Sequence, residues 1–202
     1  MNYKSLAISV IILIMTGCGS NKIAQKKYYL LEPAWETAIT EHKSNALCEV
    51  ADIIIAPAFA STQIVLRDNT HQIQYFGQHL WAVRPQESIL QLIINYLSDR
   101  QTFKQVSNRF WHNSPNYILN TKVHQLEVVQ LEKEFYAHLN IEFYVIETKT
   151  DNIIVRHRAD KQVKLKQKDL NLVAKAISKL LSDELIILTN QIENSISNIE
   201  NK

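Results

Sequence analysis

The chain has 202 residues, long enough for one domain with a proper core, and its 22 basic and 20 acidic side chains give a formal net charge of +2. This near balance of basic and acidic side chains argues against a nucleic-acid binder, which carries a basic surplus gathered on one face. The chain contains only three glycines, which excludes glycine-rich phosphate loops, dinucleotide fingerprints and nucleophile elbows.

The first residues of the chain have the pattern of a secretory leader. Lys4 supplies a positive charge, residues 6–15 form an apolar run, and small residues lead to Cys18. The apolar run is roughly ten residues long, about half of the ~20 that a membrane-spanning helix needs. We therefore predict a signal peptide over residues 1–17, cleavage between Gly17 and Cys18, and a lipidated tether over residues 18–26. An uncleaved signal anchor and a soluble secreted protein with an incidental Cys18 are the alternatives.

The residues around the predicted cleavage point add a membrane anchor to this interpretation. Met15-Thr16-Gly17-Cys18 resembles the lipobox of bacterial lipoproteins, in which the cysteine thiol takes a diacylglyceryl group. The resemblance implies acyl chains such as palmitate on Cys18, and several acyl chains hold a protein firmly at a bilayer. It also implies the outer membrane, periplasmic face, because Gly19 and Ser20 follow the cysteine where an aspartate would signal retention at the inner membrane.

Short extended segments precede the first expected helix. Residues 28–31 are a strand candidate, and residues 50–60 are apolar enough to be a strand buried on both faces, with Pro57 marking its end or a sheet edge. Residues 64–66 and 72–76 flank a polar turn over residues 67–70, which predicts a hairpin that ends at Gly77.

A change of apolar period marks the first helix. From Pro85 the period changes from two to 3.6, which predicts a helix running to about Arg100, with proline in the first turn and Glu87 near the positive end of the helix dipole. Residues 103–110 are then expected to form a strand, and Asn113-Ser114-Pro115-Asn116 breaks the chain.

The clearest β pattern lies in the second half of the chain. In residues 117–131 the apolar positions change parity twice, which predicts bulges near His124-Gln125 and Val128-Val129. Residues 135–145 alternate strictly, which predicts one buried face and places His138 on the outer face. A turn over residues 150–152 leads into a strand over residues 153–163, in which His157 is expected on the inner face together with Ile153, Val155 and Ala159.

A long helix closes the chain. Asp169 is the expected N-cap, and residues 170–192 carry a helical apolar stripe, whereas residues 193–202 are expected to form a frayed polar tail. Residues 27–192 are thus interpreted as a single domain. The order of elements predicts a two-layer α+β fold, a largely antiparallel sheet with two helices packed on one face.

No constellation of side chains marks catalysis or a metal centre. The seven histidines show no His-x-x-x-His pair, and the serines stand on no strained elbow. Glu132 and Glu134 could serve a cell-wall glycosidase, but they fall in a predicted turn where carboxylates are solvated. Cys48 is expected to be a small, half-buried hydrophobe and not a reactive thiol. We therefore expect no enzyme, no metal and no cofactor.

Aromatic residues are the candidates for contacts with a partner. Trp81 and Trp111 fall in or beside predicted loops, and Tyr75-Phe76 leads to Trp81, so these aromatic side chains are candidates to anchor a partner or an acyl chain. The alternative is that they cap the open end of the core.

The order and spacing of these features resemble a known family, the ABC-type transport auxiliary lipoproteins, whose best-known branch is the paraquat-inducible, PqiC-like one. The resemblance spans most of the chain after the leader. It rests on the lipobox ending at Cys18, Tyr28-Tyr29-Leu30-Leu31, the segment 50–60, Trp81-Ala82, the hairpin over 117–146 and the helix over 170–192.

The resemblance implies a non-enzymatic role. Members of this family are outer-membrane lipoproteins that work with an inner-membrane ABC transporter or an MCE-domain protein to move lipids or other hydrophobic molecules between the two membranes. The expected partners are thus the outer membrane, through acylated Cys18, and an MCE-domain protein or ABC permease, with a homo-oligomer left open and nucleic acid excluded. A periplasmic lipid carrier and a lipoprotein that assists outer-membrane barrel assembly are the alternative functions.

Overall fold

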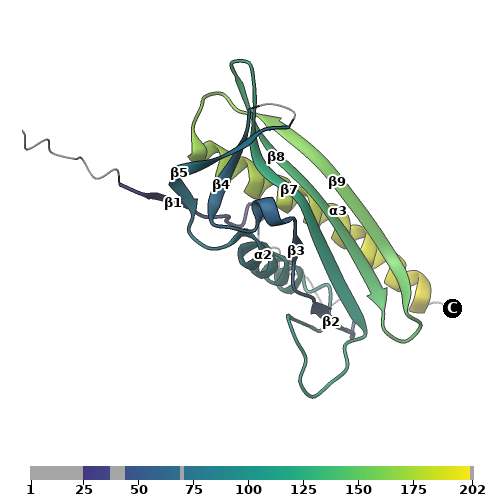
Figure 1. Ribbon diagram of the computed structural model, residues 1–202. Coiled ribbons are helices and arrows are strands. Elements are labelled where there is room, and N and C mark those ends of the chain that lie inside the picture. The colour runs from purple at the N-terminus through teal and green to yellow at the C-terminus, as the bar shows by residue number, and fades with distance from the viewer. Residues whose placement is uncertain (1–24, 37–43, 69–70, 201–202) are drawn as a thin grey trace, which may run out of the picture.

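The computed structural model of the chain describes residues 25–36, 44–68 and 71–200, and it shows a mixed sheet with helices on one face (Figure 1). The predicted α+β class is confirmed. The predicted leader, its cleavage point and Cys18 lie outside the described residues, as does Asn69-Thr70 of the predicted hairpin turn. The strands are β1 (Lys27–Tyr29), β2 (Leu47–Val50), β3 (Ile54–Ile55), β4 (Gln63–Arg67), β5 (Ile73–Trp81), β6 (Gln105–Ser107), β7 (Tyr117–Leu131), β8 (Glu134–Glu147) and β9 (Asn152–Lys164).

Three long antiparallel strands, β7, β8 and β9, form the body of the sheet (Figure 1). The strict alternation predicted for residues 135–145 is confirmed, because every second side chain of β8 points at the helices and is buried. The five members of this row from Ala137 to Val145 are 0–1% exposed. They supply the centre of a filled apolar core.

One of the two predicted bulges is present. The register of β7 against β8 shifts between Val123 and Gln125, so His124 is the extra residue and the parity of the inward side chains changes there. The second predicted bulge, at Val128-Val129, is wrong, because the register runs through both residues without a break. Both valines are buried, one on each face, so the sheet is covered on both sides at this point and two successive apolar residues need no bulge.

A second register shift, which the sequence did not predict, turns the side chain of Ile153 in β9 to the opposite face of the sheet. The pairing of β8 with β9 shifts between Val145 and Ile146, which leaves Ile154 as an extra residue. Val155, His157 and Ala159 face the helices as expected, but Ile153 does not. It pairs with Ile146 on the opposite face and is 55% exposed.

The free edge of β7 is covered by several short strands in succession. Strands β2, β3 and β4 each pair with it in parallel, and β5, β1 and β6 extend the sheet from β4 and β2. The single strand predicted over residues 50–60 is therefore wrong: this segment follows β7 in two short stretches and then turns into a 3-10 helix at Pro57–Phe59. Proline cannot donate a ladder hydrogen bond, which favours the break.

Two further boundaries differ from the sequence-based expectation. Strand β5 does not end at Gly77, because β1 pairs with its last three residues and Trp81 donates its N–H to the Thr62 carbonyl at 2.7 Å. The strand expected over residues 103–110 shrinks to β6, which meets β2 over three residues only.

Both helices lie on the same face of the sheet (Figure 1). Helix α2 (Pro85–Asp99) has Pro85 in its first turn and ends where the apolar period predicted. Helix α3 (Leu170–Glu200) begins after Asp169, whose Oδ1 accepts the Asn171 N–H at 2.8 Å, as expected of an N-cap. None of the helices in the described part of the chain is long and apolar enough to cross a membrane.

The tail predicted to fray from residue 193 is instead helical as far as Glu200. Ile192 and Ile196 are buried in the apolar core, and the Ser195 hydroxyl donates to the Ile154 carbonyl at 3.3 Å. Two isoleucines at i and i+4 are enough to hold these last turns on the core.

Candidate functional site

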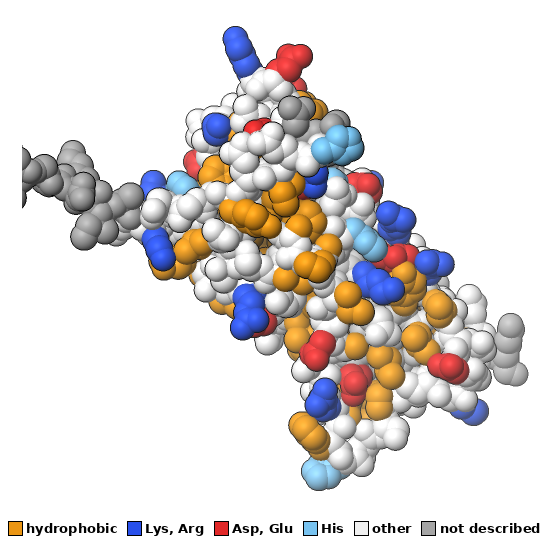
Figure 2. Space-filling model, viewed as in Figure 1, with side chains coloured by type: hydrophobic (Ala, Val, Ile, Leu, Met, Phe, Trp, Pro, Cys, Tyr) orange, Lys and Arg blue, Asp and Glu red, His pale blue; other side chains and the backbone are white. Residues whose placement is uncertain are grey.

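The face of the sheet opposite the helices is the candidate functional site. Its side chains come from alternate positions of β7, β8 and β9, together with Arg67 at the end of β4 and Ile54 in β3. Figure 2 shows hydrophobic, basic, acidic and histidine side chains mixed on this side of the molecule. We refer to it as the helix-free face. It has a polar half near the β7–β8 turn and an apolar half toward the β8–β9 turn.

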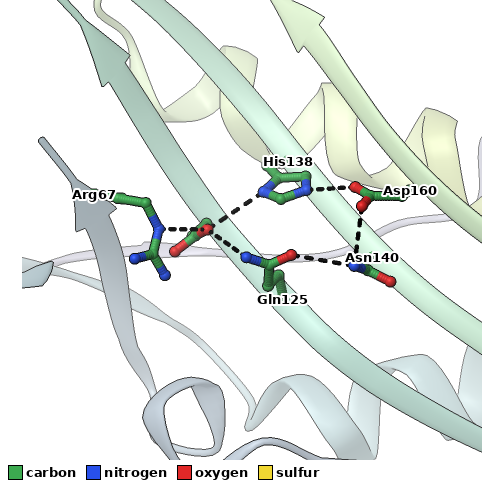
Figure 3. Close-up of polar contacts among 6 residues, drawn as sticks. Arg67, Gln125, His138, Asn140 and Asp160 are labelled. Carbon is green, nitrogen blue, oxygen red and sulfur yellow. Dashed lines mark hydrogen bonds and ion pairs between the residues drawn. The ribbon is translucent and has the colours of Figure 1, made fainter. Parts of the chain in front are cut away.

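A closed ring of hydrogen bonds occupies the polar half (Figure 3). Glu127 Oε1 contacts His138 Nδ1 at 3.3 Å, and His138 Nε2 contacts Asp160 Oδ1 at 2.7 Å. The Asn140 amide then donates to both Asp160 and Gln125 at 3.1 Å, and the Gln125 amide donates back to Glu127 at 3.4 Å. These five residues are the polar ring.

Arg67 joins the polar ring from outside. Its Nε donates to Glu127 Oε1 at 2.9 Å (Figure 3). The Glu127 side chain is 0% exposed, so the carboxylate is held away from water between a guanidinium and an imidazole. A buried carboxylate in this setting requires positive partners.

The charges of the polar ring shift the titration of its members. Burial alone would raise the pKa of Glu127, but the hydrogen bonds from His138 and Arg67 and their charges outweigh it and hold the pKa below its usual value. Burial alone would lower the pKa of His138, yet its hydrogen bonds to Glu127 and Asp160 outweigh that effect and raise the pKa. Both shifts favour the charged pair.

A second polar cluster lies in the middle of the helix-free face. Glu142 accepts from Arg156 Nε at 3.1 Å and contacts His124, the bulge residue, at 3.4 Å. Its hydrogen bond with Tyr144, together with those from Arg156 and His124, lowers the pKa of Glu142 to about 2 in spite of the desolvation that opposes it. The carboxylate therefore stays charged at any physiological pH.

The apolar half contains a shallow hollow of about 410 Å³. Tyr144 lines it, and the cations Lys122 and Arg156 lie 5.4 and 5.1 Å from the centre of the tyrosine ring. The hollow thus joins exposed apolar surface to positive charge, a combination suited to contact with another molecule. Its lining residues are Ile54, Asn120, Lys122, Tyr144, Ile146 and Ile153.

The histidine on the inner face has a different role. His157 contacts Glu184 of α3 at 2.7 Å, and both side chains are largely buried between β9 and the helix. It also stacks on Phe143, with the ring centres 6.1 Å apart. This pair fastens α3 to the sheet. Among the residues that the structure describes, no three His, Cys, Asp or Glu side chains are arranged to hold a metal ion.

The four aromatic residues proposed as partner contacts do not lie together on one surface. Trp81 is 4% exposed and packs in the core, and Phe76 is half-buried against it, so these two cap the core. Tyr75 is partly exposed and donates to the Ala58 carbonyl at 3.2 Å. Trp111 is 79% exposed on a loop, with Arg109 over its ring. Cys48 is fully buried in β2, and burial raises the pKa of its thiol, which makes it unreactive.

The polar ring is the part of the site that sequence reasoning missed. Alternation placed His138 on the outer face, and the structure confirms that placement. The partners Glu127 and Gln125 could have been found by applying the His124 bulge to β7, since the bulge moves both onto the same face. The position of Arg67 could not have been found from the sequence, because it depends on the register of β4 against β7.

The fold and this face define a small mixed α+β domain with an open sheet face that carries charged clusters and an apolar hollow. A family model described as the ABC-type transport auxiliary lipoprotein component matches residues 28–185. The chain belongs to this family, and its role is that of a transport-associated lipoprotein. The resemblance seen in the sequence is confirmed.

Solved structures share the fold at low sequence identity. Protein XCC0632 from Xanthomonas campestris is 15% identical, with a TM-score of 0.70 over 88% of this chain and 100% of that one. The crystal structure of an uncharacterized protein is 14% identical, with a TM-score of 0.68 over 83% of this chain and 99% of that one. A comparison with curated proteins finds no match.

Proposed function

We propose that the chain is a lipid-anchored periplasmic docking subunit of an ABC- or MCE-type system that moves lipids or other hydrophobic molecules between the inner and outer membranes. Membership of the auxiliary lipoprotein family is the observation that carries this proposal. In it, acylated Cys18 holds the protein at the periplasmic face of the outer membrane, and the chain itself performs no chemistry. The permease or the MCE-domain protein is the partner.

The helix-free face supports the docking role. Its apolar hollow presents Ile54, Ile146 and Ile153 beside Tyr144, and Glu142 holds Arg156 next to the tyrosine ring. Lys122 and Arg156 place positive charge at the rim. A partner segment with an apolar side chain between carboxylates would complement this surface in both shape and charge.

The core favours docking over carriage of a lipid inside the domain. Leu139, Ile141 and Phe143 are at most 1% exposed and pack directly against α3, which has Leu185 and Leu188 at 0% exposure on the facing side. Side chains therefore already fill the space between sheet and helix.

Co-purification from detergent-solubilised envelopes tests the docking proposal. We expect the wild-type protein to recover an ABC or MCE component, and Ile153→Asp to reduce that recovery several-fold, because the aspartate places a charge in the hollow. Ile187→Asp is the matched control, since Ile187 is similarly exposed but lies on α3. Recovery of the protein without any ABC or MCE component contradicts the proposal. An equal loss of the partner in both variants means that the helix-free face is not the docking surface.

The anchor and its membrane need a separate experiment. We expect radiolabelled palmitate to enter the wild-type chain and the protein to sediment with outer-membrane vesicles on a density gradient. Cys18→Ala is expected to abolish both. Sedimentation with inner-membrane vesicles would contradict the location, and an unlabelled chain would contradict the anchor.

A further inference from the structure

The end of the molecule at which β1 begins exposes apolar side chains next to basic ones. Tyr28 is 61% exposed and Leu30 is 50% exposed, and both point away from the core because the intervening Tyr29 packs inward and contacts His79 Nδ1 at 2.8 Å. The backbone that carries them is fixed, since β1 pairs with β5 and the Tyr29 carbonyl accepts the Ala82 N–H. The two exposed side chains are thus held on a rigid edge of the sheet.

Charged groups surround these two residues. Lys26 and Lys27 precede them and are exposed, and Lys175 of α3 lines a hollow of about 390 Å³ together with Leu30. Glu32 lines the same hollow beside Lys175. Burial raises the pKa of the Tyr29 hydroxyl and the nearby charge of Asp169 raises it further, so the lysines at this end are accompanied by two carboxylates. Figure 2 shows basic and hydrophobic side chains side by side at this end of the molecule. We call Lys27, Tyr28, Leu30 and Lys175 the β1 patch.

The distance from Cys18 to β1 limits where this patch can be. Nine peptide units separate Cys18 from Lys27, and a fully extended chain covers about 3.4 Å per residue, so Lys27 lies at most about 30 Å from the lipidated residue. A shorter path of the tether brings the β1 patch closer to the bilayer surface. The remainder of the domain, with the C-terminal end of α3, extends away from it (Figure 1).

We infer that the β1 patch is a membrane-contacting surface, with Tyr28 and Leu30 entering the boundary between head groups and acyl chains while Lys27 and Lys175 contact anionic head groups. The inference rests on acylated Cys18 in the proposed function and concerns a surface that the partner does not use. Tyrosine concentrates at this depth of a bilayer because its ring is apolar and its hydroxyl is polar. Lysines near an anionic surface add favourable electrostatic energy to apolar insertion.

Contact with lipid orients the domain. An acyl anchor alone leaves the orientation of the body unfixed, whereas two inserted side chains on the edge of the sheet fix one end against the leaflet. The helix-free face, whose apolar hollow lies toward the opposite end of β8 and β9, is then presented to the periplasm.

Fluorescence of the lipidated full-length protein in vesicles of phosphatidylethanolamine and phosphatidylglycerol tests this inference. An environment-sensitive probe is attached to Tyr28→Cys or Leu30→Cys, and to Ile153→Cys and Ile187→Cys as controls at similarly exposed sites outside the β1 patch. Cys48 does not interfere, because it is fully buried. We expect a blue-shifted emission and several-fold weaker quenching by aqueous iodide at positions 28 and 30, and neither change at positions 153 and 187.

Each other outcome overturns the inference. Equal quenching at all four positions means that no patch touches lipid, and protection in native envelopes but not in pure lipid vesicles means that a protein covers the patch. Protection at Ile153→Cys instead assigns lipid contact to the helix-free face. Because the vesicles contain no transporter, these results are independent of whether the docking proposal holds, and a chain that carries no palmitate is recognised beforehand by its labelling.

Discussion

Glu127 is the residue on which the polar ring depends most. Its Oε1 is shared by Arg67, His138 and Gln125, and its side chain is fully buried. Replacing it with alanine removes the carboxylate between the Arg67 guanidinium and the His138 ring, and leaves Asp160, on the far side of that ring, as the carboxylate in contact with His138. Removing one partner of a buried ion pair costs about 3–5 kcal/mol, and the partial exposure of Arg67 places the expected loss near about 3 kcal/mol. Urea unfolding of Glu127→Ala against the wild type measures it.

Glu134→Ala is the matched control for this prediction. Glu134 pairs with Lys164 on the same sheet, but both side chains are substantially exposed. Surface ion pairs contribute little, so we expect no measurable change in the free energy of unfolding. A loss of stability in Glu134→Ala as large as in Glu127→Ala would mean that burial of the polar ring is not what makes Glu127 important.

His138 makes the stability depend on pH. Its pKa is raised in the folded state, so its contribution is fully present below the unfolded value near ~6.5 and is lost as the pH rises through the folded value. Glu127 has the opposite sign: its pKa is lowered, so its contribution is present above the unfolded value near ~4.3 and is lost as the pH falls through the folded value. The polar ring is therefore most stabilising between about pH 4.3 and 6.5.

His138→Gln isolates the first of these effects. The amide keeps polar contacts but cannot titrate, so the decline in unfolding free energy from pH 6 to pH 9 is expected to be shallower than in the wild type. Urea midpoints at pH values across this range provide the comparison. Identical slopes for the two proteins would exclude His138 as the titrating group.

The last turns of α3 are held by packing, not by helix propensity. Ile196 is 3% exposed and Ile199 is 38% exposed, although both stand in the same polar sequence. We expect Ile196→Ala to reduce the free energy of unfolding by about 2 kcal/mol, the lower end of the range for a buried isoleucine because the helix end can adjust. Ile199→Ala is expected to change it by less than about 0.5 kcal/mol. Equal losses of unfolding free energy in the two variants would contradict packing of the last turns and support the frayed tail that the sequence alone predicts.

Among the elements, those with a local pattern could be predicted and those defined by pairing could not. Strand β8 and helix α2 follow from the spacing of their own apolar residues, and the His124 bulge follows from a change of parity within β7. Residues 50–60 are divided among the end of β2, β3 and a 3-10 helix. This division depends on where the segment pairs with β7, and the composition of the segment does not indicate those pairing positions.

The same distinction applies to the candidate site. The outward direction of His138 is a property of β8 alone, and it was predicted. Exposure of Ile153 depends on the extra residue Ile154, where the apolar run Ile153-Ile154-Val155 gives no parity signal that would reveal a bulge. The hollow that Ile153 lines could therefore not be predicted from the sequence. The contact of Arg67 with Glu127 from another strand could not be predicted either.

The β1 patch and the apolar hollow lie at different ends of the molecule. The β1 patch lies at the end where the described chain begins, and the apolar hollow lies toward the β8–β9 turn at the other end of the long strands (Figure 1). One chain can then touch a membrane and a partner at the same time without the two competing for the same residues. Helix α3 spans this length, and its His157–Glu184 contact ties it to β9 between the two ends.

Lengthening the tether distinguishes a membrane-contacting patch from mere proximity. If the tether alone kept β1 near the bilayer, inserting about 20 flexible residues between Ser20 and Lys26 would lower the effective concentration of β1 at the surface roughly six-fold, because this concentration falls as about the −3/2 power of tether length. A patch with its own affinity for lipid is expected to keep the probe at Tyr28→Cys protected from iodide in the lengthened protein. Further replacement of Leu30 by serine and Lys27 by glutamine is expected to remove that protection while the protein stays anchored through Cys18. Loss of protection on lengthening alone would assign the position of β1 to the tether.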